Sequence, residues 1–84
     1  PLRPMPFEIY PNPVQNTLTI ANSGHMGNTV LVVYNALGAI VLTKNLVEKT
    51  ETFSVANIPN GTYIGVVSSS DGKPIQRFKF LVMH

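Results

Sequence analysis

The fold of this chain is decided by one stretch, Ile58-Pro59-Asn60-Gly61-Thr62-Tyr63-Ile64-Gly65-Val66-Val67. Its first half has turn chemistry, because proline fixes φ and Asn-Gly accepts the positive φ that tight turns need. Its second half is rich in β-branched and aromatic residues on both alternating faces, which is typical of a buried strand. We therefore expect a central strand over residues 62–68, with a turn on each side.

A second apolar run, Val30–Tyr34, predicts another inner strand beside the first. It is followed by Asn35-Ala36-Leu37-Gly38, which predicts a type I turn closed by Gly38 in the left-handed region. Residues 39–44 are again apolar and predict the returning strand of a hairpin. The polar residues 45–51 are expected to face solvent.

The last segment, residues 75–83, follows a strong hairpin turn at Ser70-Asp71-Gly72-Lys73. Its side chains alternate, with Phe78, Phe80 and Val82 on one face and Arg77 and Lys79 on the other. This period of two predicts a strand with one face on the core and one in solvent.

The amino-terminal half shows shorter strand signals. Phe7–Tyr10 and residues 16–21 alternate, and the prolines of Tyr10-Pro11-Asn12-Pro13 separate them. Residues 22–28 form a glycine-rich loop, and Phe53–Val55 predicts one more short strand. With about seven short strands between turns, the sequence predicts an all-β antiparallel sandwich over residues 7–84. The proline-rich residues 1–6 are interpreted as a linker.

Composition argues against most kinds of chemistry. The chain has 84 residues, no cysteine and a net charge of +2 from scattered basic residues. Nucleic-acid binding needs clustered basic residues, and a membrane span needs about 18 consecutive apolar ones. The two histidines, His25 and His84, and four dispersed acids offer no metal set. Ser68-Ser69-Ser70 precedes a turn and has no nucleophile elbow. We expect no catalytic residue, no metal and no cofactor.

The three tyrosines are interpreted as core or corner residues rather than as stacking platforms for bases. Tyr34 and Tyr63 in particular are expected to be largely buried, each with its hydroxyl at a hydrogen-bond partner or at the rim of the sandwich. Two exposed tyrosines on one face would favour a binding module instead.

Three motifs occur in a fixed order along the chain. They are Tyr10-Pro11-Asn12-Pro13 with the alternating residues 17–20 after it, Val33-Tyr34-Asn35-Ala36-Leu37-Gly38, and Ile58-Pro59-Asn60-Gly61-Thr62-Tyr63. A lysine-containing apolar strand follows them. This ordered set resembles the C-terminal sorting domain of proteins exported by the type IX secretion system of Bacteroidetes, over residues 7 to 84. The resemblance implies a seven-stranded immunoglobulin-like β-sandwich that acts as a secretion signal.

The resemblance also implies partners and a route. Cargo would cross the inner membrane, pass through the periplasm, and be directed by this domain through the outer-membrane translocon to the cell surface or the medium. A sortase-like cysteine protease would then cut in or before residues 1–6. No nucleic acid and no stable membrane insertion are expected.

The residues expected to contact the translocon are those of the last strand, Lys79, Phe80, Leu81, Val82, Met83 and His84, because an edge strand offers free N–H and C=O groups. A weak or strand-swapped homodimer is also expected, since the short first strand, or the last one, could exchange between copies. Two alternatives stay open: an immunoglobulin-like adhesion or carbohydrate-binding module, for which residues 22–28 offer only His25 and Met26, and a structural spacer.

Overall fold

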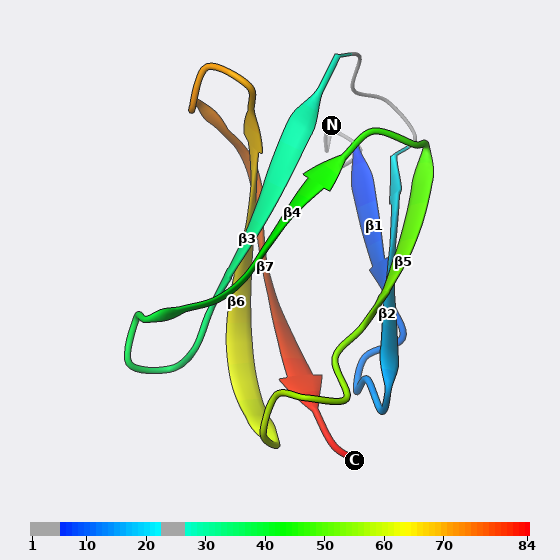
Figure 1. Cartoon of the computed structure of the whole chain (residues 1–84), viewed down its shortest axis with the longest axis vertical. Coiled ribbons are helices and arrows are strands. Elements are labelled where there is room, and N and C mark those ends of the chain that lie inside the picture. Colours follow the sequence, from blue (N-terminus) through cyan, green and yellow to red (C-terminus); the bar gives the residue numbers. More distant parts are fainter. Residues whose placement is uncertain (1–5, 23–26) are drawn as a thin grey trace, which may run out of the picture.

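The computed structural model describes residues 6–22 and 27–84, so His25 and Met26 lie outside the described residues. Within them the chain forms seven strands in two sheets that face each other (Figure 1). The strands are β1 (Phe7–Tyr10), β2 (Thr17–Asn22), β3 (Thr29–Tyr34), β4 (Ile40–Leu46), β5 (Thr50–Ser54), β6 (Gly61–Ser69) and β7 (Pro74–Val82).

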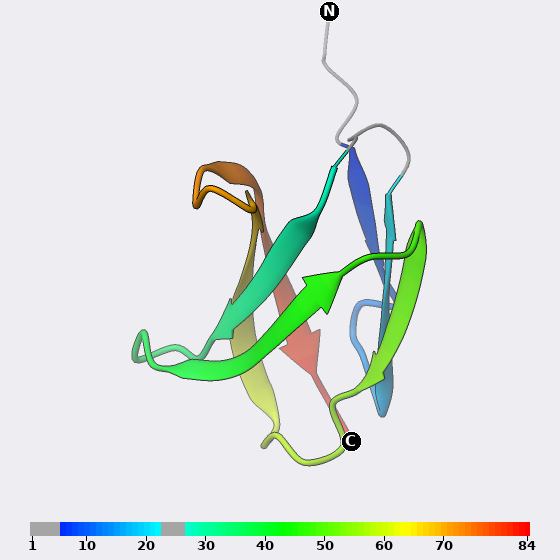
Figure 2. The same cartoon turned by 45° about the horizontal axis from the view of Figure 1, so that its top comes forward.

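The two sheets have the orders β1-β2-β5 and β4-β3-β6-β7, and all paired strands are antiparallel. The all-β antiparallel sandwich predicted from the sequence is therefore confirmed, with β3 and β6 as the inner pair. In an immunoglobulin constant domain the fourth strand lies on the sheet of the first, second and fifth. Here β4 pairs with β3 instead, at one edge of the four-stranded sheet, and β7, which pairs only with β6, is the other edge strand, as Figure 2 also shows.

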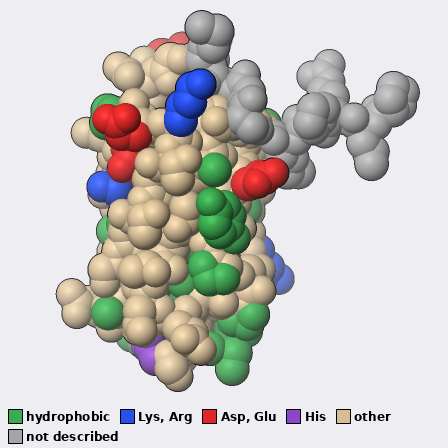
Figure 3. Space-filling model, turned by 90° about the vertical axis from the view of Figure 1, so that its right-hand side faces the viewer, with side chains coloured by type: hydrophobic (Ala, Val, Ile, Leu, Met, Phe, Trp, Pro, Cys, Tyr) green, Lys and Arg blue, Asp and Glu red, His purple; other side chains and the backbone are tan. Residues whose placement is uncertain are grey.

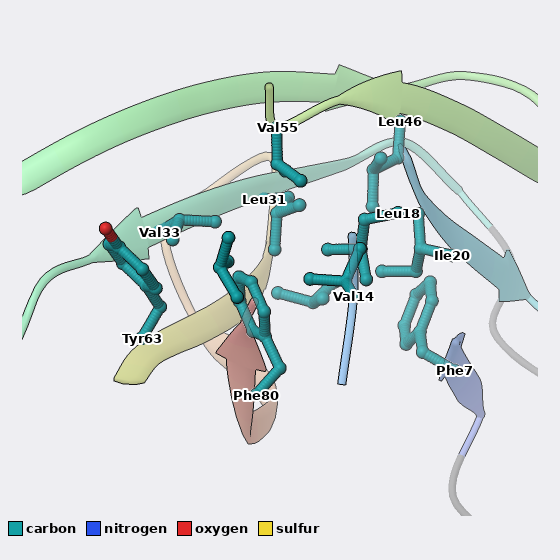
Figure 4. Packing of buried hydrophobic residues seen from close by; sticks show 12 residues of the cluster. Phe7, Val14, Leu18, Ile20, Leu31, Val33, Leu46, Val55, Tyr63 and Phe80 are labelled. Atoms are coloured by element: carbon teal, nitrogen blue, oxygen red, sulfur yellow. The ribbon is translucent and has the colours of Figure 1, made fainter. Parts of the chain in front are cut away.

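The core lies between the sheets and receives alternate side chains from both (Figure 4). Because successive side chains of a strand point to opposite faces, Leu31 and Val33 of β3 and Leu18 and Ile20 of β2 all enter the core between the sheets. The buried hydrophobic residues are Phe7, Val14, Leu18, Ile20, Leu31, Val33, Leu46, Val55, Tyr63, Val67, Phe80 and Val82.

The prediction that residues 45–51 face solvent was wrong at its first part. β4 continues to Leu46, whose side chain is buried in the core, and β5 begins at Thr50. Leu46 pairs with Thr29 across β3 and β4, and the sheet register carries its side chain inward, whereas the apolar Val47 next to it is exposed. Two adjacent apolar residues in an otherwise polar segment show no periodicity that would predict which of them is buried.

The inner pair of strands is apolar on both faces, but only one face is fully covered. In β3 the residues alternate between buried and half-buried, and the half-buried ones include Val32 and Tyr34 on the outer face. Ile64 and Val66 of β6 are their outer-face partners. The expectation that Tyr34 is largely buried holds only in part: its side chain is half-buried and lies outside the core, because Val33 takes the core position and a two-layer sandwich has no third layer over Tyr34.

Gly61 begins β6 with a φ of 157°, which confirms the positive φ predicted for this turn. An added Cβ would meet only Tyr63 Cε2 at 3.8 Å, an ordinary contact, so packing does not forbid a side chain there. We expect Gly61→Ala to lower the free energy of unfolding by about 1 kcal/mol through backbone conformation alone. Urea unfolding measures this, and an unchanged midpoint would refute it.

Candidate recognition strand

The strand β7 separates buried from exposed side chains by simple alternation. Phe80 and Val82 are buried, and Phe80 stacks on Tyr63 of β6 with ring centroids 5.8 Å apart. The half-buried Phe78 lies over Gly65, which faces it across the strand pair. The exposed side chains on the outer side are those of Arg77, Lys79, Leu81 and Met83.

The outer edge of β7 is covered at one end. The N–H of Leu81 donates to Oδ1 of Asn12 over 3.1 Å, and its C=O accepts the N–H of Val14 at 2.8 Å. The N–H of Met83 donates to the C=O of Val14, also at 2.8 Å, in a short parallel bridge. The prediction that this whole edge has free N–H and C=O groups was therefore wrong at Leu81 and Met83. The cause is the segment between β1 and β2, which crosses to the other sheet.

His84 is held against the loop between β5 and β6. Its N–H donates to Oδ1 of Asn60 at 2.9 Å, and its Nε2 lies 2.7 Å from the C=O of Ile58. The chain after β7 and the β5–β6 loop lie side by side at the bottom of Figure 1. His84 thus anchors the residues that follow β7 to the turn that precedes β6.

The other end of β7 is joined to β1 by a side-chain amide. Gln76 accepts the N–H of Phe7 on Oε1 at 3.0 Å and donates from Nε2 to the C=O of Phe7 at 2.9 Å. The amide satisfies the backbone groups of Phe7 as a neighbouring strand would. Gln76 therefore ties the two sheets together where the edges of β1 and β7 approach.

Tyr63 forms a tyrosine corner at the start of β6. Its ring is buried and its hydroxyl donates to the C=O of Pro59, four residues earlier, over 2.5 Å. In immunoglobulin-like sandwiches a tyrosine at the start of the sixth strand makes this kind of bond across the corner. The prediction that Tyr63 is buried with a partner for its hydroxyl is confirmed.

Removing that hydroxyl gives a clean test of the corner. We expect Tyr63→Phe to keep the stacked ring and to lower the free energy of unfolding by about 1 kcal/mol, since one hydrogen bond is lost. Chemical denaturation measures the change, with the exposed Tyr10→Phe as the matched control. Equal losses in both variants would contradict the role of the corner.

The remaining motif residues are scattered over the fold. Tyr10 is 47% exposed at the end of β1, so its interpretation as a core or corner residue was wrong. Pro11 and Pro13 flank Asn12 in the segment that reaches β7, and they border a shallow surface hollow with residues 15–17. Gly38 closes the β3–β4 turn with a φ of 87°, as predicted. The tyrosines form no shared exposed platform, because Tyr63 is buried and Tyr34 lies on the opposite face of its sheet.

The acidic side chains with shifted pKa values stabilise turns. The pKa of Glu51 is lowered because its carboxylate accepts the N–H groups of Glu48 and Val47, each at 3.0 Å. The pKa of Asp71 is lowered by the hydroxyl of Ser69 and then by the N–H of Lys73, within the β6–β7 turn.

The surface offers little for other chemistry. On the side of the three-stranded sheet, charged side chains of both signs occur singly (Figure 3). In residues 6–22 and 27–84, no group of three or more histidine or acidic side chains could hold a metal ion. No helix in this part of the chain is long and apolar enough to cross a membrane. A shallow hollow on the outer face of the four-stranded sheet is lined by Tyr34, Asn35, Ala36, Gly38, Ile64, Val66 and Arg77.

The chain's two facing antiparallel sheets define a small immunoglobulin-like β-sandwich domain. Residues 8–81 match the family described as the secretion system C-terminal sorting domain. The chain belongs to this family, and it is a sorting signal of the type IX secretion system that directs export across the outer membrane to the cell surface or the medium. The family and the fold both favour a non-enzymatic domain.

A solved structure shows the same fold. It is a DUF3244 family protein with an immunoglobulin-like β-sandwich from Bacteroides vulgatus ATCC 8482, at a TM-score of 0.73 and 18% sequence identity. The match covers 90% of this chain and 83% of that chain. At this identity the likeness concerns the fold alone. No curated protein matches the chain.

Proposed function

We propose that the outer-membrane translocon recognises this sorting domain through the exposed side of β7, formed by Lys79, Leu81 and Met83. The observation that supports this is the strict division of the strand. Phe80 and Val82 are buried in the core, whereas the neighbouring side chains face solvent. A receptor can therefore contact β7 without unfolding the domain, and recognition can be altered separately from stability.

The test is a reporter that carries this chain, produced in a bacterium with the type IX system. Lys79→Ser, Leu81→Ser and Met83→Ser are combined in one variant. We expect the reporter to remain in the periplasm while the thermal midpoint of the purified domain stays within a few degrees, because exposed substitutions change stability little. Cell fractionation and thermal unfolding measure the two effects.

A matched control uses exposed residues of the same kinds elsewhere, Ile40→Ser, Val47→Ser and Lys49→Ser. This variant should be exported normally. A reporter whose domain ends before Phe80 should also stay in the periplasm with its domain uncleaved. Normal surface delivery of the β7 variant or of the shortened domain would disprove the assignment.

We also propose that a sortase-like cysteine protease cuts in or before residues 1–6, which act as the linker to the cargo, leaving residues 7–84 as the released domain. Because β1 begins at Phe7, a cut before it leaves all seven strands in the released piece. Mass spectrometry of that piece should find an amino terminus before Phe7. An amino terminus inside any strand, or a cargo delivered with the domain still attached, would contradict this proposal.

We further infer a weak homodimer by exchange of β1 when the domain is free of its cargo. β1 has four residues and pairs with β2, and Gln76 binds it through Phe7. A strand of four residues forms few backbone hydrogen bonds, so the same strand of a second copy can replace it. Light scattering that shows monomer alone across high protein concentrations would refute the dimer.

A further inference from the structure

The edge of β7 remains open between its two covered ends. In an antiparallel pair the N–H and C=O of one residue point to the same side, and the side alternates along the strand. Leu81 directs both groups away from β6, toward Asn12 and Val14. Two and four residues earlier, Lys79 and Arg77 direct theirs to the same outer side. Among the described residues these groups have no hydrogen-bond partner.

The open stretch is short and has defined ends. Gln76 closes it on one side by binding the backbone of Phe7, and Asn12 closes it on the other by binding the N–H of Leu81. It offers two N–H and two C=O groups, enough for an added strand of about five residues. Covering chain blocks both ends of the stretch, and at its middle Arg77 and Lys79 oppose a strand of like charge. The uncovered backbone groups are therefore open to an added strand of opposite charge.

The side chains around the open stretch specify what such a strand contains. On the outer face stand Arg77 and Lys79, which have no ion-pair partner among the described residues. On the inner face lies Phe78, half-buried and packed against the core. Side chains of paired strands meet on the same face, so the added strand would place acidic residues beside the two cations and apolar residues beside the ring.

We propose that β7 binds, at Arg77–Lys79, an extended segment of a partner protein in which acidic and apolar residues alternate. The added strand becomes the fifth of the sheet, beside β7. This inference rests on the proposed function, in which β7 is the strand that the secretion machinery recognises. The partner's backbone would bind at Arg77 and Lys79, because Asn12 and Val14 already cover the edge at residues 81–83.

The test uses the purified chain and synthetic hexapeptides with blocked ends. The first peptide alternates valine and aspartate, and the second alternates valine and lysine. The third has the composition of the first without the alternation, three valines followed by three aspartates. We expect the first peptide alone to slow amide exchange at Arg77 and Lys79, as measured by NMR. Equal effects of all three peptides, or no effect of the first at millimolar concentration, would overturn the proposal.

Two variants separate the backbone contact from the charge. Lys79→Pro removes the outward N–H, which an edge position tolerates, and should weaken binding of the valine–aspartate peptide by about fivefold or more. Lys79→Ala keeps the N–H and should weaken it less. The double variant R77E/K79E should reverse the preference to the valine–lysine peptide. An unchanged preference in the double variant would overturn the charge assignment.

The peptide assay contains no secretion machinery, so its failure differs from a failure of the proposed function. One outcome is that the peptide does not bind but the reporter with serine at residues 79, 81 and 83 still fails to be exported. This outcome would rule out strand addition and leave the sorting role of the outer face. Peptide binding together with normal export of that serine variant would support the edge site and remove the proposed recognition by the translocon.

Discussion

Replacing Phe80 by alanine is expected to destabilise the domain more than any other single change in β7. The ring is 2% exposed, stacks on Tyr63 and lies in the centre of the core. Truncating a buried phenylalanine removes its transfer free energy and leaves a cavity, at a cost of about 3–5 kcal/mol. A domain of 84 residues has a total free energy of unfolding of roughly 4–12 kcal/mol, so a large part of it would be lost.

Guanidinium unfolding followed by circular dichroism measures this loss. The control is the neighbouring Lys79→Ala, whose side chain is exposed and whose effect should stay within about 0.5 kcal/mol. The contrast also bears on export, because a defect caused by Phe80→Ala would reflect misfolding rather than lost recognition. Similar stability of the two variants would show that Phe80 is not a core residue.

Substituting Gly65 by alanine is expected to have the second largest effect. A Cβ at this position would lie 2.2 Å from Cζ of Phe78, and 2.6 Å and 2.7 Å from its Cε2 and Cε1. No real Cβ tolerates such contacts, so the ring must leave its place over the strand. Overpacking of this kind costs about 1–3 kcal/mol.

A double-mutant cycle identifies the cause. Phe78→Leu removes the ring atoms that clash, so Gly65→Ala should cost about 1 kcal/mol less in that background. Gly38→Ala is the control, because nothing lies within 4 Å of its added Cβ and its cost comes from the φ of +87° alone. Gly38→Ala should lower the free energy of unfolding by the same amount in the wild-type and the Phe78→Leu backgrounds. A strictly additive cycle for Gly65 would refute the contact.

Both substitutions affect β7, whose inner side chains complete the core. Its outer side chains and open edge are the surfaces that we propose for a partner. Under this proposal recognition depends on folding, since an unfolded domain loses both the strand and the face it presents. Export experiments therefore separate recognition from folding only when the substitutions are confined to the outer side of β7.

Local chemistry was enough to predict most of the strands. The alternation from Arg77 to Val82 correctly assigned Phe80 and Val82 to the core and Lys79 to solvent, because side-chain direction in a strand depends only on position along it. Turn residues with special φ were likewise predictable, as Gly38 and Gly61 show. The ordered motifs around Tyr34 and Tyr63 also led to the sorting-domain family that residues 8–81 match.

Local chemistry did not predict which face or edge another strand would cover. Tyr34 ends an apolar run typical of a core strand, but a sandwich of two layers leaves its side chain only half-buried. Leu46 becomes a core residue through its register with Thr29, whereas its apolar neighbour Val47 is exposed.

Most of the strands, the turns and the family could therefore be predicted without the structure, since each depends on neighbouring residues or on the order of motifs. The tertiary structure alone decided that Asn12 covers Leu81, that Gln76 binds Phe7 and that Gly65 admits the ring of Phe78. The first two contacts join residues 69 positions apart. They exist because the two sheets bring distant edges together, and strand periodicity contains no information about which edges meet.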